Sequence, residues 1–375
     1  MSDRTNPSSP TRRTVLRFAA GAGLLGFGAV SCGVLDEEET PQPQPPAGTE
    51  RPPSQPNPPA KQEGRRFGAE WESHARTFMS WPASTGIWDD QLPGVRADIA
   101  RLAKAIAGYE HVVLFARPGQ VDAARKACGD EVEVVPLAVD DLWARDTVPV
   151  FVEEGGHVKG VDFNFNGWGN KQKEHGNDSA LAAAVLGKYG IERIRTPLVG
   201  EGGSFESDGQ GTLMVTESSV VNDNRNKGRS RDQVEAELKQ ALGVSKVIWF
   251  AGVKGEDITD AHVDCLVRFV APGVVLLDQP FPGAPGDVWS RSAAQAREVL
   301  KTATDALGRP LKVVELPQPD PDRITGRGDA FVSSYINFYI ANKAVVIPKF
   351  GDAEADERAR RIIGEQLPGR EVVQV

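Results

Sequence analysis

Apolar residues recur at helical spacing in five segments, and runs rich in β-branched residues separate these segments. In the first, Val95, Ile99 and Ile106 fall on one helical face. The third opens on Ser230 with Gln233 three residues later, which is the capping-box pattern of a helix start. The segments predicted to be helical are 95–106, 178–189, 230–242, 290–307 and 354–367.

The predicted strands lie between these helices, in the runs 111–116, 132–138, 147–152, 158–165, 212–221, 247–250, 266–277, 312–316 and 335–347. The helix starts follow one another at steps of about 65 residues. This order predicts an α/β fold, built either from repeated units that close into a ring or as a plain sandwich whose helices happen to be evenly spaced. The spacing alone does not separate these two architectures.

The first 66 residues do not match a folded domain. Arg12 and Arg13 form a twin-arginine pattern, and the apolar run 18–30 is shorter than a bilayer-spanning helix. It ends on a lipobox-like Ala29–Cys32, so we expect an export signal over 1–33 with Cys32 as the lipidated residue. An ordinary signal cut near Ser31 is the alternative. The segment 34–66 holds nine prolines between residues 41 and 59, which predicts a disordered linker.

Composition assigns the folded domain to 67–375 and narrows its ligands. The chain of 375 residues carries a net charge of -9, which disfavours nucleic acid and favours a cationic ligand. Its three cysteines, Cys32, Cys128 and Cys265, have no paired spacing, so we expect no disulfide framework and no thiolate metal cluster.

The residues with candidate chemistry lie in polar segments next to predicted strands. His262 and Asp264 are two positions apart, so on an extended chain both would face one side and Cys265 the other. A histidine beside a carboxylate makes an acid–base unit, and Asp146 and Asp264 suit the donor fork of a guanidinium. Each motif alone is weak, since such pairs are usually structural. A metal site from His262, Asp264 and Asp146 is a poor alternative, because no other histidine has ligand-like spacing.

Taken in order, eleven segments resemble the agmatine deiminase family, which belongs with bacterial peptidylarginine deiminases in the guanidine-modifying superfamily. They are Glu70–Glu72, Thr77–Pro82, Trp143–Thr147, Phe165–Lys171, Glu201–Ser204, Gly211–Leu213, Asn224–Asn226, Lys246–Trp249, His262–Asp264, Pro272–Leu276 and Ser334–Asn342. The resemblance implies the pentein fold, a five-bladed α/β propeller of ββαβ-type units around a central site. It also implies deimination, in which a cysteine thiolate attacks the guanidinium carbon and water completes the hydrolysis.

The resemblance also assigns roles to residues of this sequence. It implies that Asp146 and Asp264 hold the guanidinium and that His262 moves the protons. The substrate-binding candidates are Trp143, Trp168, Glu201 and Asn337. No cofactor and no metal is implied, the expected partner is a small guanidine, and a homo-oligomer stays open.

One departure from the family pattern concerns the nucleophile. Family members close on a Gly-rich loop with a His-Cys pair, whereas this sequence runs to Val375 without one. We therefore expect an incomplete last blade and no family nucleophile in this chain. Cys128 is interpreted as buried and inert, and Cys265 as pointing away from the site.

The loop Asn166–Lys171 has the agmatine-type pattern, with Trp168 where bacterial peptidylarginine deiminases carry arginines. This favours agmatine, converted to N-carbamoylputrescine in polyamine metabolism. The export signal favours the alternative, a protein-arginine deiminase that forms citrulline. A third hypothesis is an envelope lipoprotein that binds guanidines without turnover. In each case we expect a location outside the cytoplasmic membrane.

Overall fold

The computed structural model describes residues 64–324 and 332–375. The predicted signal 1–33, including Cys32, and residues 34–63 of the predicted linker lie outside the described residues. The last two linker positions form β1 (Arg65–Arg66), which pairs antiparallel with β5 through Glu154 and Glu153.

Four successive units share the order strand, strand, helix, strand. The first is β5 (Val150–Glu154), β6 (His157–Asp162), α6 (Gly176–Tyr189) and β7 (Glu192–Arg195). The second is β8 (Glu206–Ser207), β9 (Thr212–Thr216), α8 (Arg231–Leu242) and β10 (Lys246–Phe250). The third is β11 (Val267–Ala271), β12 (Val274–Gln279), α9 (Val288–Thr302) and β13 (Lys312–Pro317), and the fourth is β14 (Tyr339–Ile340), β15 (Ala344–Ile347), α10 (Ala353–Gln366) and β16 (Glu371–Gln374). In each unit the first two strands are antiparallel, and the helix returns the chain to a parallel third strand.

A further sheet has a different order. It contains β2 (Thr77–Ser80), α2 (Leu92–Ala107), β3 (Val112–Ala116), α3 (Val121–Cys128) and β4 (Val132–Pro136), with all three strands parallel. Short helices lie in the connections: α1 (Thr85–Trp88), η2 (Asp89–Gln91), η3 (Pro118–Gln120), α4 (Ala144–Thr147), α5 (Gly167–Asn170), η4 (Gly202–Ser204), α7 (Glu217–Val220), η5 (Val263–Cys265) and η6 (Pro321–Arg323).

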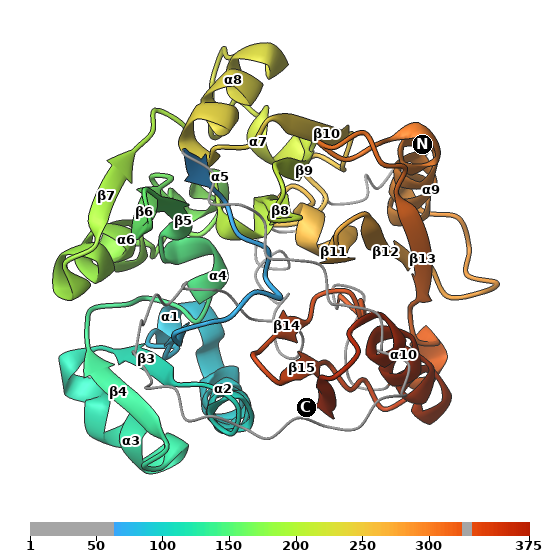
Figure 1. Cartoon of the computed structure of the whole chain (residues 1–375). Coiled ribbons are helices and arrows are strands. Elements are labelled where there is room, and N and C mark those ends of the chain that lie inside the picture. Colours follow the sequence, from blue (N-terminus) through green and yellow to red (C-terminus); the bar gives the residue numbers. More distant parts are fainter. Residues whose placement is uncertain (1–63, 325–331) are drawn as a thin grey trace, which may run out of the picture.

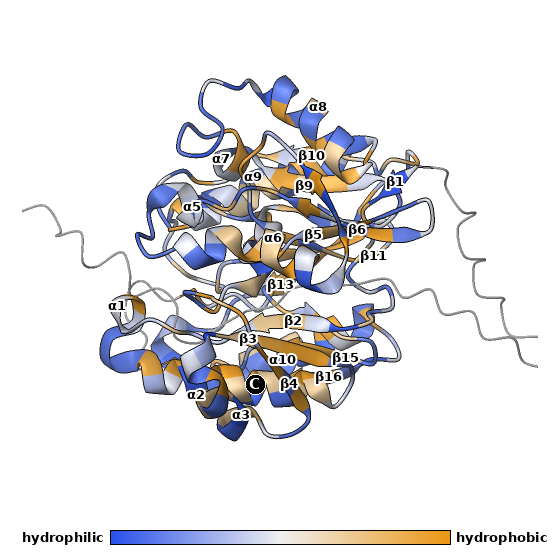
Figure 2. Ribbon diagram, turned by 90° about the vertical axis from the view of Figure 1, so that its left-hand side faces the viewer, coloured by the Kyte–Doolittle hydropathy of each residue, from blue (hydrophilic) through white to orange (hydrophobic). Residues whose placement is uncertain are grey.

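The strands of the described residues thus form five sheets, which surround a common middle (Figure 1). The long helices α3, α6, α8 and α10 lie outside the sheets in this view. Their apolar faces pack on the strands, and Figure 2 shows polar and apolar residues alternating along α2 and α8 beside apolar strands such as β3 and β9. Burial of these faces supplies the main driving force for folding.

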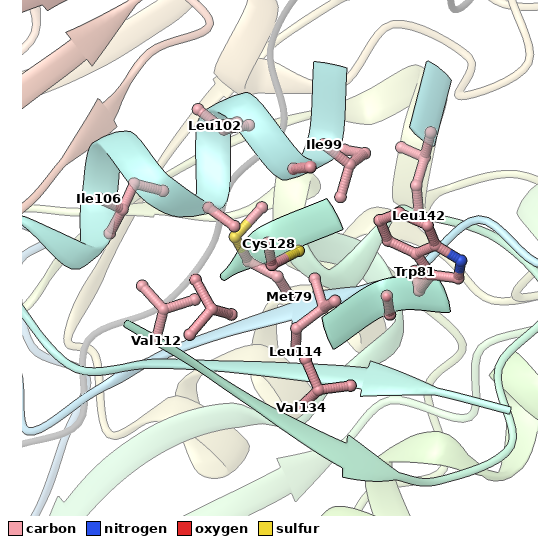
Figure 3. Packing of buried hydrophobic residues seen from close by; sticks show 14 of the residues in the cluster. Met79, Trp81, Ile99, Leu102, Ile106, Val112, Leu114, Cys128, Val134 and Leu142 are labelled. Atoms are coloured by element: carbon pink, nitrogen blue, oxygen red, sulfur yellow. The ribbon is translucent and has the colours of Figure 1, made fainter. Parts of the chain in front are cut away.

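The cluster between α2, α3 and the parallel sheet illustrates this packing (Figure 3). Ile99 and Ile106 of α2 meet Val112 and Leu114 of β3, and all four are at most 2% exposed. Cys128 lies fully buried in the same cluster, where burial raises the pKa of its thiol to about 11. The expectation that Cys128 is buried is confirmed, and its inertness stays a prediction that the raised pKa supports.

Most predicted elements are present. The capping box of α8 forms as expected, because Ser230 Oγ accepts from Gln233 N at 3.3 Å and Gln233 Oε1 accepts from Ser230 N at 2.9 Å. The helix predicted over 290–307 ends at Thr302, because the Asp305 carboxylate accepts from the backbone of Leu307 and Arg309 and closes a turn there.

Three predicted strands differ in form. The run 266–277 is the hairpin of β11 and β12, which turns at Gly273 with φ 74°. The run 335–347 is likewise a hairpin, of β14 and β15, and within 212–221 the strand β9 gives way to α7 after Thr216. These runs are apolar on both sides of each turn, so the pattern of hydrophobic residues could not predict where the turns lie.

The expectation of an incomplete last blade is wrong for the unit itself. Glu371–Gln374 form β16, which pairs in parallel with β15 from Ala344 to Ile347. Val372 and Val373 are adjacent, so they face opposite sides of the strand and pack against two different clusters. The fourth unit therefore has the same three strands as the others.

None of the helices in 64–324 and 332–375 combines the length and apolarity that crossing a bilayer requires.

Candidate active site

The site residues come from the connections that lead from one unit to the next. Asp146 precedes β5, Glu201 precedes β8, His262 and Asp264 precede β11, and Asn337 precedes β14. These connections lie toward the middle of Figure 1, where the first strands of the units begin. Residues more than a hundred positions apart in sequence are thereby brought together.

Gly203 marks the point at which three of these side chains meet. A Cβ on this residue would lie 2.5 Å from His262 Nδ1, 2.8 Å from Asp264 Oδ2 and 2.9 Å from Asp146 Oδ1. All three groups are at most 8% exposed. Two carboxylates and one imidazole therefore surround a single backbone position that only glycine can occupy without displacing them.

Asp146 is held from two sides. Its Oδ2 accepts from the indole nitrogen of Trp168 at 2.9 Å, and its Oδ1 accepts from Gly203 N at 2.9 Å. Burial raises the pKa of Asp146. The charge of His262 lowers this pKa, whereas the charge of Asp264 raises it further. Trp168 is only 2% exposed and sits at φ 52°, so its ring fixes the carboxylate from inside the fold.

His262 lies between two carboxylates. Its Nε2 is 3.3 Å from Glu201 Oε2, and its Nδ1 is 3.8 Å from Asp146 Oδ1. Burial lowers the pKa of His262, but the charges of Asp146, Glu201 and Asp264 outweigh this and raise it to about 9. The imidazole is therefore protonated at neutral pH and can donate a proton.

The chain around His262 is not extended, so the argument from strand parity is wrong. Asp260 and Ala261 have φ of 62° and 64°, and η5 follows directly. Asp257 accepts from Ala261 N at 3.0 Å and stabilises this turn. His262 and Asp264 still face the same point, but a 3₁₀ turn rather than a strand brings them there.

Cys265 does not point away from the site, contrary to expectation. Asn337 Nδ2 donates to its sulfur at 3.1 Å, and Asp264 also contacts the thiol. Burial, Asp264 and Asp257 raise the pKa of this thiol well above its ordinary value. Cys265 is therefore a neighbour of the site whose sulfur stays protonated at neutral pH.

The remaining predicted residues contact neighbours of these groups or, in the case of Glu201, His262 itself. Trp143 packs edge-on against Trp168 with ring centroids 6.2 Å apart and is half-buried, as is Asn337. Glu201 is fully buried, with its two oxygens toward Arg225 Nε at 2.8 and 3.0 Å. Arg225 was not among the predicted site residues. Its position between two asparagines, in a polar segment after a strand, is the signal that could have identified it.

Known proteins match this chain over most of its length. Residues 66–375 match the family model described as Porphyromonas-type peptidyl-arginine deiminase. An agmatine deiminase of Stutzerimonas stutzeri is 38% identical over 338 residues, covering 84% of this chain and 91% of that protein. One from Medicago truncatula is 35% identical over 340 residues, covering 83% and 90%.

Solved structures agree. The agmatine deiminase of Enterococcus faecalis superposes with a TM-score of 0.77 at 31% identity, covering 84% of this chain and 91% of that one. The putative arginine deiminase of Porphyromonas gingivalis gives 0.73 at 29% identity, covering 83% and 92%. The family resemblance predicted from the sequence is confirmed, and the chain belongs to the Porphyromonas-type peptidyl-arginine deiminase family.

Proposed function

We propose that this chain is an agmatine deiminase-type hydrolase, which converts agmatine and water to N-carbamoylputrescine and ammonia. The observation that carries the proposal is the convergence of Asp146, Asp264 and His262 on Gly203. The relatives named agmatine deiminase support the choice of substrate. The same arrangement supports the five sheets as blades of a propeller with the site at its centre.

The charges of the site favour a guanidinium. Asp146, Asp264, Glu201 and Asp260 bring four carboxylates to this network. Three positive charges, those of His262, Arg225 and Lys171, belong to it. A cationic ligand would balance the remaining carboxylate, and the two aspartates could each accept two of its N–H donors. His262 would donate its proton to the departing ammonia and then take one from the attacking water.

The covalent step needs a thiolate. Cys128 is packed in an apolar cluster, and the pKa of Cys265 is raised by burial and by Asp264, so neither cysteine of the described residues is poised to attack. This observation favours a second candidate function, in which the site binds guanidines without hydrolysing them.

Agmatine is preferred over a peptidyl-arginine because of the loop at Trp168. The indole of Trp168 is buried and donates to Asp146, so the loop presents an apolar ring beside the site. Residues 166–171 contain no arginine that could pair with a substrate carboxylate. The loop's cation, Lys171, is engaged by Asp260 at 2.8 Å.

Asp146→Asn tests the proposed site. Because charged hydrogen bonds contribute about 1.5–3 kcal/mol, we expect calorimetric agmatine binding to weaken by about 10- to 100-fold. Asp122→Asn is the control, because that carboxylate is fully exposed on α3. Binding by the unaltered chain with ammonia release supports the hydrolase, and binding without release supports the second candidate. The absence of both heat and ammonia overturns the two together.

Cys265→Ser tests whether the thiol of Cys265 takes part in binding or turnover. A serine can still accept from Asn337, so we expect agmatine affinity to stay within about two-fold, a difference well under 1 kcal/mol. If ammonia release were present and were abolished by this change, Cys265 would be the nucleophile, and our reading of its thiol would be wrong.

We also propose export by the twin-arginine route with lipid attachment at Cys32, which the sequence pattern supports. Cys32→Ser should then move the protein from the membrane fraction to the soluble fraction. An unchanged distribution would contradict the anchor.

A further inference from the structure

Arg225 is a fully buried cation that the proposed chemistry does not use directly. Its Nε donates to both oxygens of Glu201, at 2.8 and 3.0 Å. Its Nη1 donates to Asp260 Oδ2 at 2.8 Å, and its Nη2 donates to the Thr259 carbonyl at 2.9 Å. Every one of these partners lies beside His262 in space or in sequence.

The two carboxylates that Arg225 joins determine where His262 lies. Glu201 faces its Nε2 at 3.3 Å. Asp260 precedes it by two residues and adopts φ 62°, a conformation that must be held by contacts. Lys171 and the backbone of Gly255 supply further contacts to Asp260, each at 2.8 Å.

The charge of Arg225 also determines the state of Glu201. Glu201 is 0% exposed, and burial raises the pKa of its carboxyl, whereas Arg225 and His262 bring it below its ordinary value. Without the arginine, a carboxyl at this depth would lose its principal compensating charge. A neutral Glu201 would no longer attract a proton to His262.

We propose that Arg225 is a positioning residue for the proton carrier His262, because it holds Glu201 ionised and directed at Nε2 while fixing the turn that presents the imidazole. This inference rests on the role proposed above for His262. It names a residue that acts through another side chain and does not touch the substrate.

The other two carboxylates facing His262 form no ion pair or hydrogen bond with Arg225 in the described part of the chain. Asp146 is fixed by Trp168 and Gly203, and Asp264 belongs to η5 itself. The hydrogen bonds of Arg225 in the described residues go to Glu201, Asn224, Asp260 and Thr259 instead. Removing the arginine should therefore alter one of the three carboxylates around the imidazole and leave two in place.

The test is the titration of His262 by NMR in the full-length chain with isotope-labelled histidine, without substrate. His262→Gln assigns the resonance among the five histidines. In Arg225→Gln we expect the midpoint to fall from about 9 toward the ordinary value of about 6.5, by about one unit or more. Glu201→Gln should give a similar fall, and the double variant should fall by less than the sum of the two single falls, because both changes act on Glu201.

The direction of the shift decides the question. Direct repulsion between two cations would make the midpoint rise when Arg225 is removed, so a rise, no change or an additive double variant overturns the proposal. Arg225→Lys keeps the charge and should hold the midpoint close to that of the unaltered chain, which keeps the proposal testable if Arg225→Gln fails to fold. A fall in Arg225→Lys as large as in Glu201→Gln would also overturn it.

Arg193→Gln is the matched control, because Arg193 pairs with Asp162 at 2.6 Å and neither group is among the charges that raise the pKa of His262, so the midpoint should not move. Turnover is not needed for this measurement. A chain that binds no agmatine can still confirm the role of Arg225, and an unchanged midpoint would say nothing against agmatine binding.

Discussion

Two buried arginines, Arg225 and Arg268, each join two carboxylates, but their neighbours differ. The side chains are 0% and 1% exposed, respectively. The partners of Arg225 are Glu201 and Asp260, and the first of these continues to His262. This network therefore ends on an imidazole, which can gain or lose a proton and whose pKa is raised to about 9.

The ion pairs of Arg268 form a closed network, which ends on a second arginine, and Asp264 is a further charge near it. Arg268 bonds Glu206 at 2.8 Å and Glu70, and Glu70 is also paired with Arg145 at 2.9 Å. Its guanidinium stacks over the Phe338 ring at 4.5 Å. Two arginines face two carboxylates here, and the contacts tie the segment before β2 to β8, β11 and the turn before β14.

The difference shows that a buried ion pair does not reveal its role by itself. Burial costs both networks several kcal/mol per charge, and each recovers this only through complete pairing. What separates them is the next neighbour: a histidine in one case and a second arginine in the other. We therefore expect the Arg268 network to serve stability and the Arg225 network to control the protonation of His262.

The largest effect should come from breaking the closed network. Arg268→Met leaves Glu70 and Glu206 buried with one compensating charge fewer, which should lower the free energy of unfolding by about 3–5 kcal/mol. Urea unfolding of the full-length chain measures it. Arg101→Met is the control, because its ion pair with Asp98 is exposed and is expected to contribute at most about 1 kcal/mol. Equal losses in the two variants would mean that the closed network has no special structural role.

The next effect concerns pH. The pKa of His262 is about 9 when folded and about 6.5 when unfolded, so its stabilising contribution is complete below about pH 6.5 and disappears as the pH rises through 9. The free energy of unfolding should fall by up to about 3 kcal/mol over this interval.

Other groups titrate in the same interval, since burial raises the pKa of Asp178 to about 8 and that of Glu206 to about 7. They are present in His262→Gln as well, so the difference between the two proteins isolates the histidine. If unfolding curves at pH 6 and pH 9 changed by the same amount in both, the imidazole would not be held protonated.

Four of the residues predicted for the site lie together in the structure, and the sequence marked them for a physical reason. Asp146, Glu201, His262 and Asp264 lie in polar segments next to apolar strands, and that contrast is visible without a structure. It also predicted the long helices, because the apolar spacing and the cap at Ser230 are local features. Family resemblance, rather than periodicity, assigned the chemistry.

What the sequence could not show depends on geometry across distant segments. The positive φ of Asp260 and Ala261 turned a predicted extended segment into a 3₁₀ turn and reversed the argument for Cys265. The pairing of Arg225 with Glu201 joins residues that are distant until the units pack together. The strand β16 is short and polar at its start, so it carried no clear strand pattern.

The smallest effect concerns the group around His262 that the Arg225 network reaches. It tests whether this group depends on the close spacing of its side chains as well as on their charges. Gly203→Ala places a methyl group 2.5 Å from His262 Nδ1 and 2.8 Å from Asp264 Oδ2, so one of these groups must move. Such overpacking costs about 1–3 kcal/mol, and we expect agmatine affinity to fall by about ten-fold or more while the fold is retained. Gly187→Ala on α6, where a methyl group meets open space, should leave affinity unchanged. Calorimetry on both variants measures the difference. If Gly203→Ala bound agmatine as well as Gly187→Ala, the three groups would have room to adjust, and close approach at Gly203 would not define the site.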